Sequence, residues 1–93
     1  MKKSSFYTRK TGGIVERVNG WTDGTYNYYK NGNQWFCIVP EVGLAAATGY
    51  SRKDVMLQAY NQDIVDKITA IMDRDGEKLK EKFNSLIQEA ENN

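Results

Sequence analysis

Hydrophobic side chains recur with two different periods along this chain, and the period changes near residue 50. Between residues 14 and 49, apolar and polar positions alternate in short runs, which is typical of β-strands. From residue 51 onward, apolar positions recur every three or four residues, which is typical of amphipathic helices. The order of the two patterns predicts an α+β fold with the strands first and the helices after them.

The alternating part predicts three or four antiparallel strands that form a meander. The expected strands cover residues 14–18, 25–30, 34–39 and 42–48. Asn31 and Gly32 predict a tight hairpin between the second and third strands, with both residues at positive φ. Pro40 is expected to end the third strand, since it has no amide hydrogen to pair.

The third strand is apolar on both sides. Alternation places Trp35, Cys37 and Val39 on one face, and Phe36 and Ile38 on the other. Such a strand is expected to lie in the middle of a sheet that is covered on both sides.

A capped helix is predicted to begin after Ser51. Ser51 is a good N-cap with Asp54 at N3, and Tyr50 and Val55 are placed to form a hydrophobic staple. The apolar stripe expected to pack on the sheet is formed by Leu57, Tyr60, Ile64, Ile68 and Ile71. The stretch 61–63 is the weak point at which this helix would kink or restart.

A second helix is predicted after a break at residues 73–76, which read Asp-Arg-Asp-Gly. Its apolar stripe is formed by Leu79, Phe83, Leu86, Ile87 and Ala90.

The length of 93 residues suits one domain. The net charge of +1 hides an asymmetry, because residues 1–20 sum to +4 and residues 73–93 sum to −2. We expect a flexible basic N-terminal arm over residues 1–12 and a single α+β domain over residues 13–93.

No apolar run reaches the length of about 20 residues that a membrane span needs, and we expect neither a membrane segment nor a secretory signal. Cys37 is the single cysteine and has no internal disulfide partner. These features favour an intracellular, reducing compartment, the cytoplasm.

Most catalytic chemistry lacks its usual residues here. The chain has no histidine, and one cysteine does not build a zinc site. Cys37 lies within an apolar strand, where a buried structural thiol is expected. The pairs Asp63/Asp66 and Asp73/Asp75 are best explained as solvated helix surface. We therefore expect a non-enzymatic protein with no catalytic residue, metal or cofactor.

Aromatic residues are concentrated on two neighbouring strands, with Trp21 in the turn before them. Core packing is the first explanation for this group, a protein interface the second, and stacking of nucleic-acid bases the third. We hypothesise that one aromatic face stays exposed and contacts a protein partner through Tyr26, Tyr28, Tyr29 and Trp35.

The alternative function is nucleic-acid binding by the basic arm and the basic helix start. The residues concerned are Lys2, Lys3, Arg9, Lys10, Arg52 and Lys53. Capping by Ser51 is the stronger explanation of the helix start than an anion site. A homodimer is a further alternative, through a strand edge or the second helix.

Two segments, Ile38-Val39-Pro40-Glu41-Val42-Gly43-Leu44 and Thr48-Gly49-Tyr50-Ser51-Arg52-Lys53-Asp54-Val55, resemble the core of HicB-like antitoxins. That resemblance implies a β-β-β-α unit that binds and neutralises a small RNA-cleaving toxin. Similar units occur in small proteins of phages and mobile elements, including inhibitors of bacterial defence systems. Together with the aromatic group, the resemblance leads us to expect an inhibitor that occupies a protein partner. It also implies that the protein acts in a bacterial, or phage-infected bacterial, cell. The family's DNA-binding extension is replaced here by what is predicted to be a plain helix.

Overall fold

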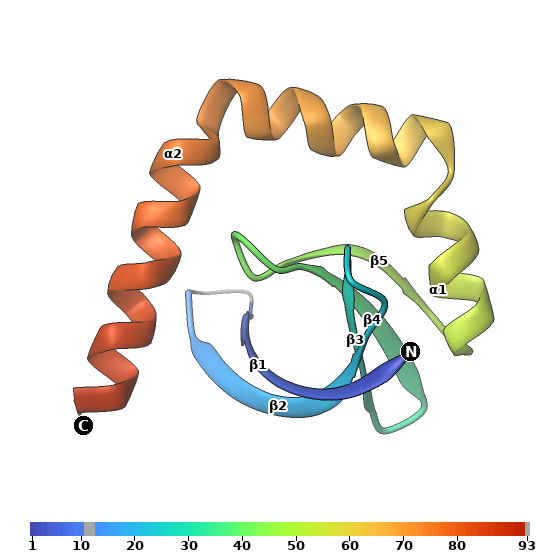
Figure 1. Cartoon of the computed structure of the whole chain (residues 1–93), viewed down its shortest axis with the longest axis horizontal. Coiled ribbons are helices and arrows are strands. Elements are labelled where there is room, and N and C mark those ends of the chain that lie inside the picture. The colour runs from blue at the N-terminus through green and yellow to red at the C-terminus, as the bar shows by residue number, and fades with distance from the viewer. Residues whose placement is uncertain (11–12, 93) are drawn as a thin grey trace.

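The protein folds as one antiparallel sheet followed by two helices (Figure 1). The computed structural model describes residues 1–10 and 13–92. The elements are β1 (Lys2–Arg9), β2 (Val15–Thr22), β3 (Asn27–Asn31), β4 (Gln34–Val39), β5 (Leu44–Gly49), α1 (Arg52–Ala59) and α2 (Gln62–Asn92). The strands lie in the order β1-β2-β3-β4-β5. The α+β class with strands before helices is confirmed, and the sheet has five strands rather than three or four.

The additional strand is β1, which lies where a flexible arm was expected. Each residue from Lys2 to Arg9 has a partner on β2, and the register runs from Lys2 opposite Thr22 to Arg9 opposite Val15. The expectation of a flexible arm is therefore wrong for residues 2–9, while residues 11 and 12 lie outside the described part of the chain. The prediction was wrong because β1 is mostly polar in sequence. Only alternate residues of this strand face the interior, chiefly Phe6 and Thr8.

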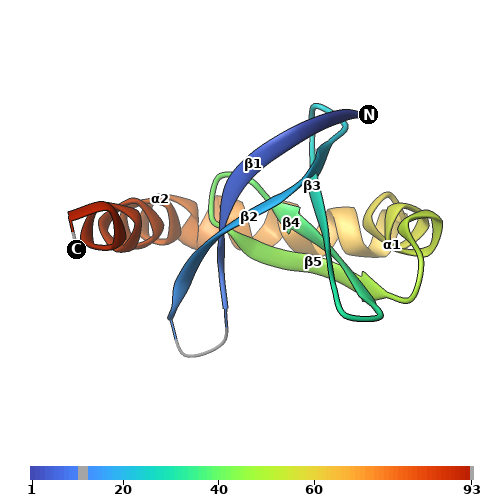
Figure 2. The ribbon, with the colours of Figure 1, turned by 90° about the horizontal axis from the view of Figure 1, so that it is seen from below.

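The sheet curls so strongly that its first and last strands approach each other. The amide of Arg9 donates to the carbonyl of Gly43, just before β5, at 2.8 Å. The rings of Phe6 on β1 and Tyr29 on β3 lie 6.2 Å apart although β2 runs between those strands. The curl gives the sheet an inner face and an outer face, and the helices lie outside the curl (Figures 1 and 2). The rings of Phe6 and Tyr29 lie on the inner face.

Gly20 makes this curvature possible within β2. A Cβ atom at this position would collide with the carbonyl oxygen of Tyr28, and it would lie 3.1 Å from the Phe6 ring. Trp21 was expected to lie in a turn, but β2 continues through Asn19 and Gly20 to Thr22. Glycine acts here as a bend inside a long strand, which is a common role of strand glycines.

The β3–β4 hairpin occurs where it was predicted but uses a different pair of turn residues. Asn31 still pairs with Gln34, so the two-residue loop is Gly32-Asn33. Gly32 has a φ of 63°, and no residue other than glycine has positive φ among the described residues. The expectation of positive φ at Asn31 is therefore wrong, and the arrangement is that of a turn with glycine at the first central position.

β4 is the central strand that its sequence predicts. It ends at Val39, before Pro40, and pairs with β3 on one side and β5 on the other. The following strand begins at Leu44 rather than residue 42, since Gly43 adopts a φ of 70° and its amide bonds the carbonyl of Val39 at 2.8 Å. The run of alanines is a strand, as expected.

The hydrophobic core lies between the outer face of the sheet and the helices. Its buried members are Tyr26, Tyr28, Cys37, Val39, Val42, Ala47, Val55 and Ala59. Trp35 packs against this cluster, which confirms that it shares a face with Cys37 and Val39. On the inner face, the ring of Phe36 stacks on Tyr29 at 5.0 Å, as expected for the opposite side of β4.

Ser51 caps α1 as predicted, because its Oγ accepts the amide of Asp54 at 3.1 Å. The staple does not form, since Tyr50 is 82 % exposed while Val55 is fully buried beside Gly49. The predicted stripe is correct only in part, because Leu57, Tyr60 and Ile71 are exposed. The helix stops at Ala59 and restarts at Gln62, which changes the phase of the stripe at the expected weak point.

The predicted break at residues 73–76 is wrong, since α2 is one helix of 31 residues. Figure 1 shows that α2 bends about midway along its length. Gly76, in the middle of its sequence, favours such a bend because glycine stabilises a helix least among the non-proline residues. Phe83, in the second half, is buried against Gly43. Among the described residues, no helix is both long and apolar enough to cross a membrane.

Candidate binding surface

Three of the four aromatic residues expected to contact a partner are inside the protein. Tyr26, Tyr28 and Tyr29 are 7 %, 0 % and 6 % exposed. Tyr26 and Tyr28 belong to the core under α1, and Tyr29 packs on the inner face. The expectation that these tyrosines form an exposed binding face is therefore wrong, and the physical reason is that a domain of this size needs their apolar area for its core.

The hydroxyl groups of the tyrosines have a structural role that the sequence did not reveal. The Oδ2 atom of Asp23 accepts a hydrogen bond from the hydroxyl of Tyr28 and another from that of Tyr60, each at 2.7 Å. The Oδ1 atom accepts the amides of Thr25 at 2.9 Å and Tyr26 at 2.7 Å. One carboxylate thus joins the β2–β3 turn, the core and the end of α1.

Electrostatics at this carboxylate favour its charged form. Partial burial raises the pKa of Asp23, but the hydrogen bonds from Tyr26, Tyr60, Tyr28 and Thr25 outweigh it and lower the net pKa below 3.8. Burial and the bond to Asp23 raise the pKa of Tyr28 and of Tyr60, so both hydroxyls stay protonated donors. We call Asp23, Tyr28 and Tyr60 the tyrosine–aspartate cluster.

The two tryptophans lie together on the outer face, beyond the core. The Trp21 and Trp35 ring centroids are 5.5 Å apart with a 42° tilt, and both rings are partly buried. Lys3 pairs directly with Trp21, and Lys30 pairs directly with Trp35. Residues that are directly opposite in an antiparallel pair project from the same face. We call these four residues the tryptophan patch, which spans β1 to β4.

Positive charge continues from this patch along β1 and β2. Arg17 and Arg9 share the outward register with Lys3. The guanidinium of Arg17 lies 5.4 Å from the centroid of the Tyr7 ring, and its Nε donates to Ser5 Oγ at 3.1 Å. Within the five strands, all of which the structure describes, this register holds four cations and no acidic residue.

Asp23 and Asp54 are acidic residues near the end of this face that carries the tryptophans. Asp23 follows β2, and both of its oxygens are occupied by the hydrogen bonds described above. Asp54 lies in the first turn of α1, near Gly49, which is the β5 partner of Trp35. The face therefore has a positive interior and a weakly acidic edge.

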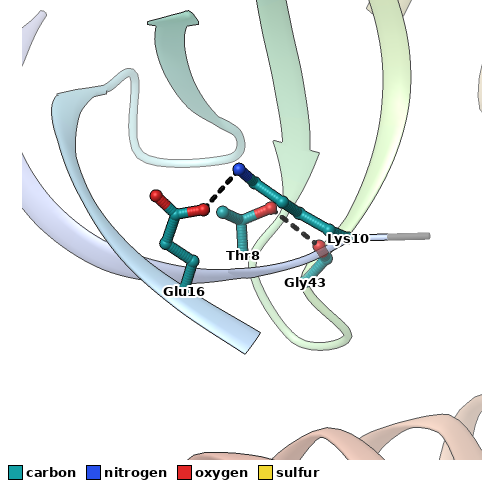
Figure 3. Close-up of polar contacts among 4 residues, drawn as sticks. All are labelled: Thr8, Lys10, Glu16 and Gly43. Atoms are coloured by element: carbon teal, nitrogen blue, oxygen red, sulfur yellow. Dashed lines mark hydrogen bonds and ion pairs between the residues drawn. The ribbon is translucent and has the colours of Figure 1, made fainter. Parts of the chain in front are cut away.

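The remaining basic candidates do not join the patch. Lys2 is opposite Thr22 and so faces away from Lys3. Lys10 forms an ion pair with Glu16 (Figure 3), and this hydrogen bond raises its pKa. Thr8 Oγ1, which lies beside them, donates to the Gly43 carbonyl at 3.4 Å and helps to hold β1 against the loop before β5. Arg52 and Lys53 are exposed in the first turn of α1.

Cys37 is fully buried, as expected, and burial raises the pKa of its thiol to about 12. A thiol with so high a pKa is a poor nucleophile at neutral pH. Within residues 1–10 and 13–92, no group of three acidic or cysteine side chains is placed to hold a metal ion.

Trp35 and Lys3 were both predicted from the sequence to be candidate binding residues. Trp21, however, was expected in a turn, and Lys3 in a flexible arm. Their proximity depends on the β1–β2 register, which continues through Gly20. The sequence did hold a signal for a strand at β1, namely the alternation of Lys3, Ser5 and Tyr7 with inward-facing positions. That signal was weak, because only Phe6 among the inward-facing residues is strongly apolar.

Comparisons with protein-family models, curated proteins and solved structures found no match to this chain. The resemblance to HicB-like antitoxins therefore stays a prediction.

Proposed function

We propose that this protein is a non-enzymatic nucleic-acid-binding module that uses the outer face of β1–β4. The proposal rests on the segregation of charge, because the outward strand register carries Lys3, Arg9, Arg17 and Lys30 without an acidic residue. A polyanion gains affinity from such a surface by releasing counterions, even where the net charge of the protein is close to zero. From the sequence alone, nucleic-acid binding was the alternative to a protein-binding function. We now favour it, because the basic N-terminal residues belong to the sheet and not to a flexible arm.

The test is fluorescence anisotropy of a labelled oligonucleotide at low salt. We expect binding with a dissociation constant in or below the range of about 10⁻⁴ to 10⁻⁶ M. The affinity should fall with salt, with a log–log slope no steeper than about −3 for a single strand that contacts four cations. The double variant Lys3→Glu/Lys30→Glu should weaken binding by about tenfold or more. Lys2→Glu/Lys10→Glu makes the same charge change away from the patch and should have a much smaller effect. An unchanged anisotropy at low salt contradicts the proposal.

A protein partner is the second candidate function, and a different surface favours it. Tyr50 is 82 % exposed and Leu57 is 64 % exposed, and both lie on or beside α1. Exposed large apolar side chains are candidate anchors for a protein interface. The inhibitor suggested by the HicB-like resemblance would then use α1 rather than the buried tyrosines.

Two double variants distinguish the two candidate functions. Tyr50→Ser/Leu57→Ser should abolish capture of a bacterial protein by the tagged chain if α1 is the interface, while Lys3→Glu/Lys30→Glu should leave capture unchanged. The opposite dependence, or capture that neither variant alters, rejects α1 as the interface.

A further inference from the structure

We propose that the tryptophan patch selects single-stranded over double-stranded nucleic acid by stacking unpaired bases on Trp21 and Trp35. This inference rests on the proposed function and adds the form of the ligand. It follows from three observations: the position of the rings, the placement of the cations and the shape of the surface beside them.

The rings are placed where a base could reach them. Trp21 and Trp35 are in contact with each other on the outer face, and each keeps part of its surface exposed. Aromatic rings on a sheet bind bases through their π faces, which requires bases that are not stacked within a duplex. A duplex would present its phosphates to this face and leave the apolar surface of the rings without an apolar partner.

Each ring has a lysine as its direct cross-strand neighbour. Lys3 is directly opposite Trp21, and Lys30 is directly opposite Trp35. Both lysines are exposed. A single strand that places two adjacent bases on the rings has its phosphates within reach of flexible lysine side chains. Arg17 lies on the same face of β2, four residues before Trp21, and adds a further positive charge beyond the two lysines.

The surface beside Trp21 is hollowed and polar. A shallow cavity of about 480 Å³ is lined by Lys3, Ser4, Ser5, Asn19, Gly20 and Trp21. Asn19 offers an amide side chain next to an aromatic ring and a cation, a combination that suits a nucleotide better than an apolar peptide.

Tryptophan fluorescence tests the inference directly, because Trp21 and Trp35 are the two tryptophans of the chain. Titration with oligothymidylate should quench the emission of both rings, and a blunt duplex of equal length should bind about tenfold more weakly at the same salt concentration. Trp21→Phe and Trp35→Phe, each leaving one reporter, should show quenching at both positions.

Anisotropy with the labelled single strand measures the contribution of each ring. Trp21→Ala should weaken single-strand binding by about tenfold while duplex binding changes little, and Trp21→Phe should restore most of the affinity. If Trp21→Ala does not fold, Asn19→Glu serves instead, since this exposed position adds a negative charge beside the ring without altering the core.

The outcomes distinguish the inference from the function on which it rests. Equal affinity for single strand and duplex, or affinity that neither Trp21→Ala nor Asn19→Glu lowers, overturns base stacking while leaving nucleic-acid binding intact. Failure of both ligands to bind at low salt overturns the proposed function as well.

Discussion

The aromatic residues of this sheet form two groups that differ in what surrounds them. The tyrosines of β3 are buried, and two tyrosine hydroxyls, from Tyr28 and Tyr60, bind the same carboxylate oxygen of Asp23. The tryptophans of β2 and β4 stay partly exposed, and each has a lysine as its direct cross-strand partner. Trp21 and Tyr28 are direct cross-strand partners, so neighbouring positions on one face belong to different groups.

The difference shows how the edge of a covering helix divides a sheet face. Val55 and Ala59 of α1 cover the part of the face that carries Tyr28 and Cys37. Rings under the helix contribute their area to the core, while rings beyond its edge remain partly exposed. Composition alone does not separate Tyr28 from the two tryptophans, because all three residues are aromatic, adjacent and on the same face.

The largest effect on stability is expected from the tyrosine group. Tyr28→Ala removes a fully buried ring and leaves a cavity, which should lower the free energy of unfolding by about 3–5 kcal/mol. Trp21→Ala should cost less than half as much, since its ring is only partly buried. Chemical denaturation monitored by far-ultraviolet circular dichroism measures both. Equal losses of unfolding free energy in the two variants would contradict the distinction between buried tyrosines and partly exposed tryptophans.

Replacement of the carboxylate should have the next largest effect. Asp23→Asn weakens four hydrogen bonds to a charged group and should cost about 1–3 kcal/mol at pH 7. Because folding lowers the pKa of Asp23, its contribution is fully present above its unfolded pKa of 3.8 and is lost as the pH falls through the lower folded value.

The difference between wild type and Asp23→Asn should therefore shrink between pH 5 and about pH 2, which urea denaturation at several pH values will show. A difference that stays constant over this range would mean that the charge of Asp23 contributes little to folding.

A smaller loss is expected from removing one hydroxyl of the tyrosine–aspartate cluster. Tyr60→Phe keeps the ring that packs edge-on against Tyr26 at 5.2 Å but deletes the donor to Asp23. The expected cost is about 1 kcal/mol, measured as a shift in the urea midpoint. Tyr50→Phe is the matched control at an exposed ring and should change stability by less than about 0.5 kcal/mol.

The smallest effect on stability should come from the lysines of the tryptophan patch. Lys3→Ala is expected to alter the free energy of unfolding by no more than about 0.5 kcal/mol, because the side chain is exposed. It should nevertheless weaken oligonucleotide binding several-fold more than Lys2→Ala, its neighbour on the other face of β1. Similar losses from the two variants would place the ligand elsewhere.

The sequence correctly predicted the turns and ends of elements that depend on neighbouring residues alone. Asn31-Gly32 marked the β3–β4 hairpin, Pro40 the end of β4, and Ser51 the start of α1. What the sequence did not predict depends on contacts between distant residues. β1 is stabilised by β2 and by Gly43 rather than by its own polar sequence.

The candidate site illustrates the same limit. Trp35 and Lys3 were both identified as functional candidates, but for different functions, since nothing local shows that they share a face. The acceptor role of Asp23 also depends on Tyr60, which lies 37 residues away in the chain. Exposure of the tyrosines was predicted wrongly because the cover supplied by α1 is a tertiary property.

The most direct test of the division between the two groups is an NMR titration of isotope-labelled protein with oligothymidylate at low salt. The account predicts that the indole N–H signals of Trp21 and Trp35 shift together with the amide signals of Lys3 and Lys30. The amides of Tyr28 and of the second half of α2 should stay in place. Indole signals that do not move while other amides respond, or no response at any position, would contradict the account.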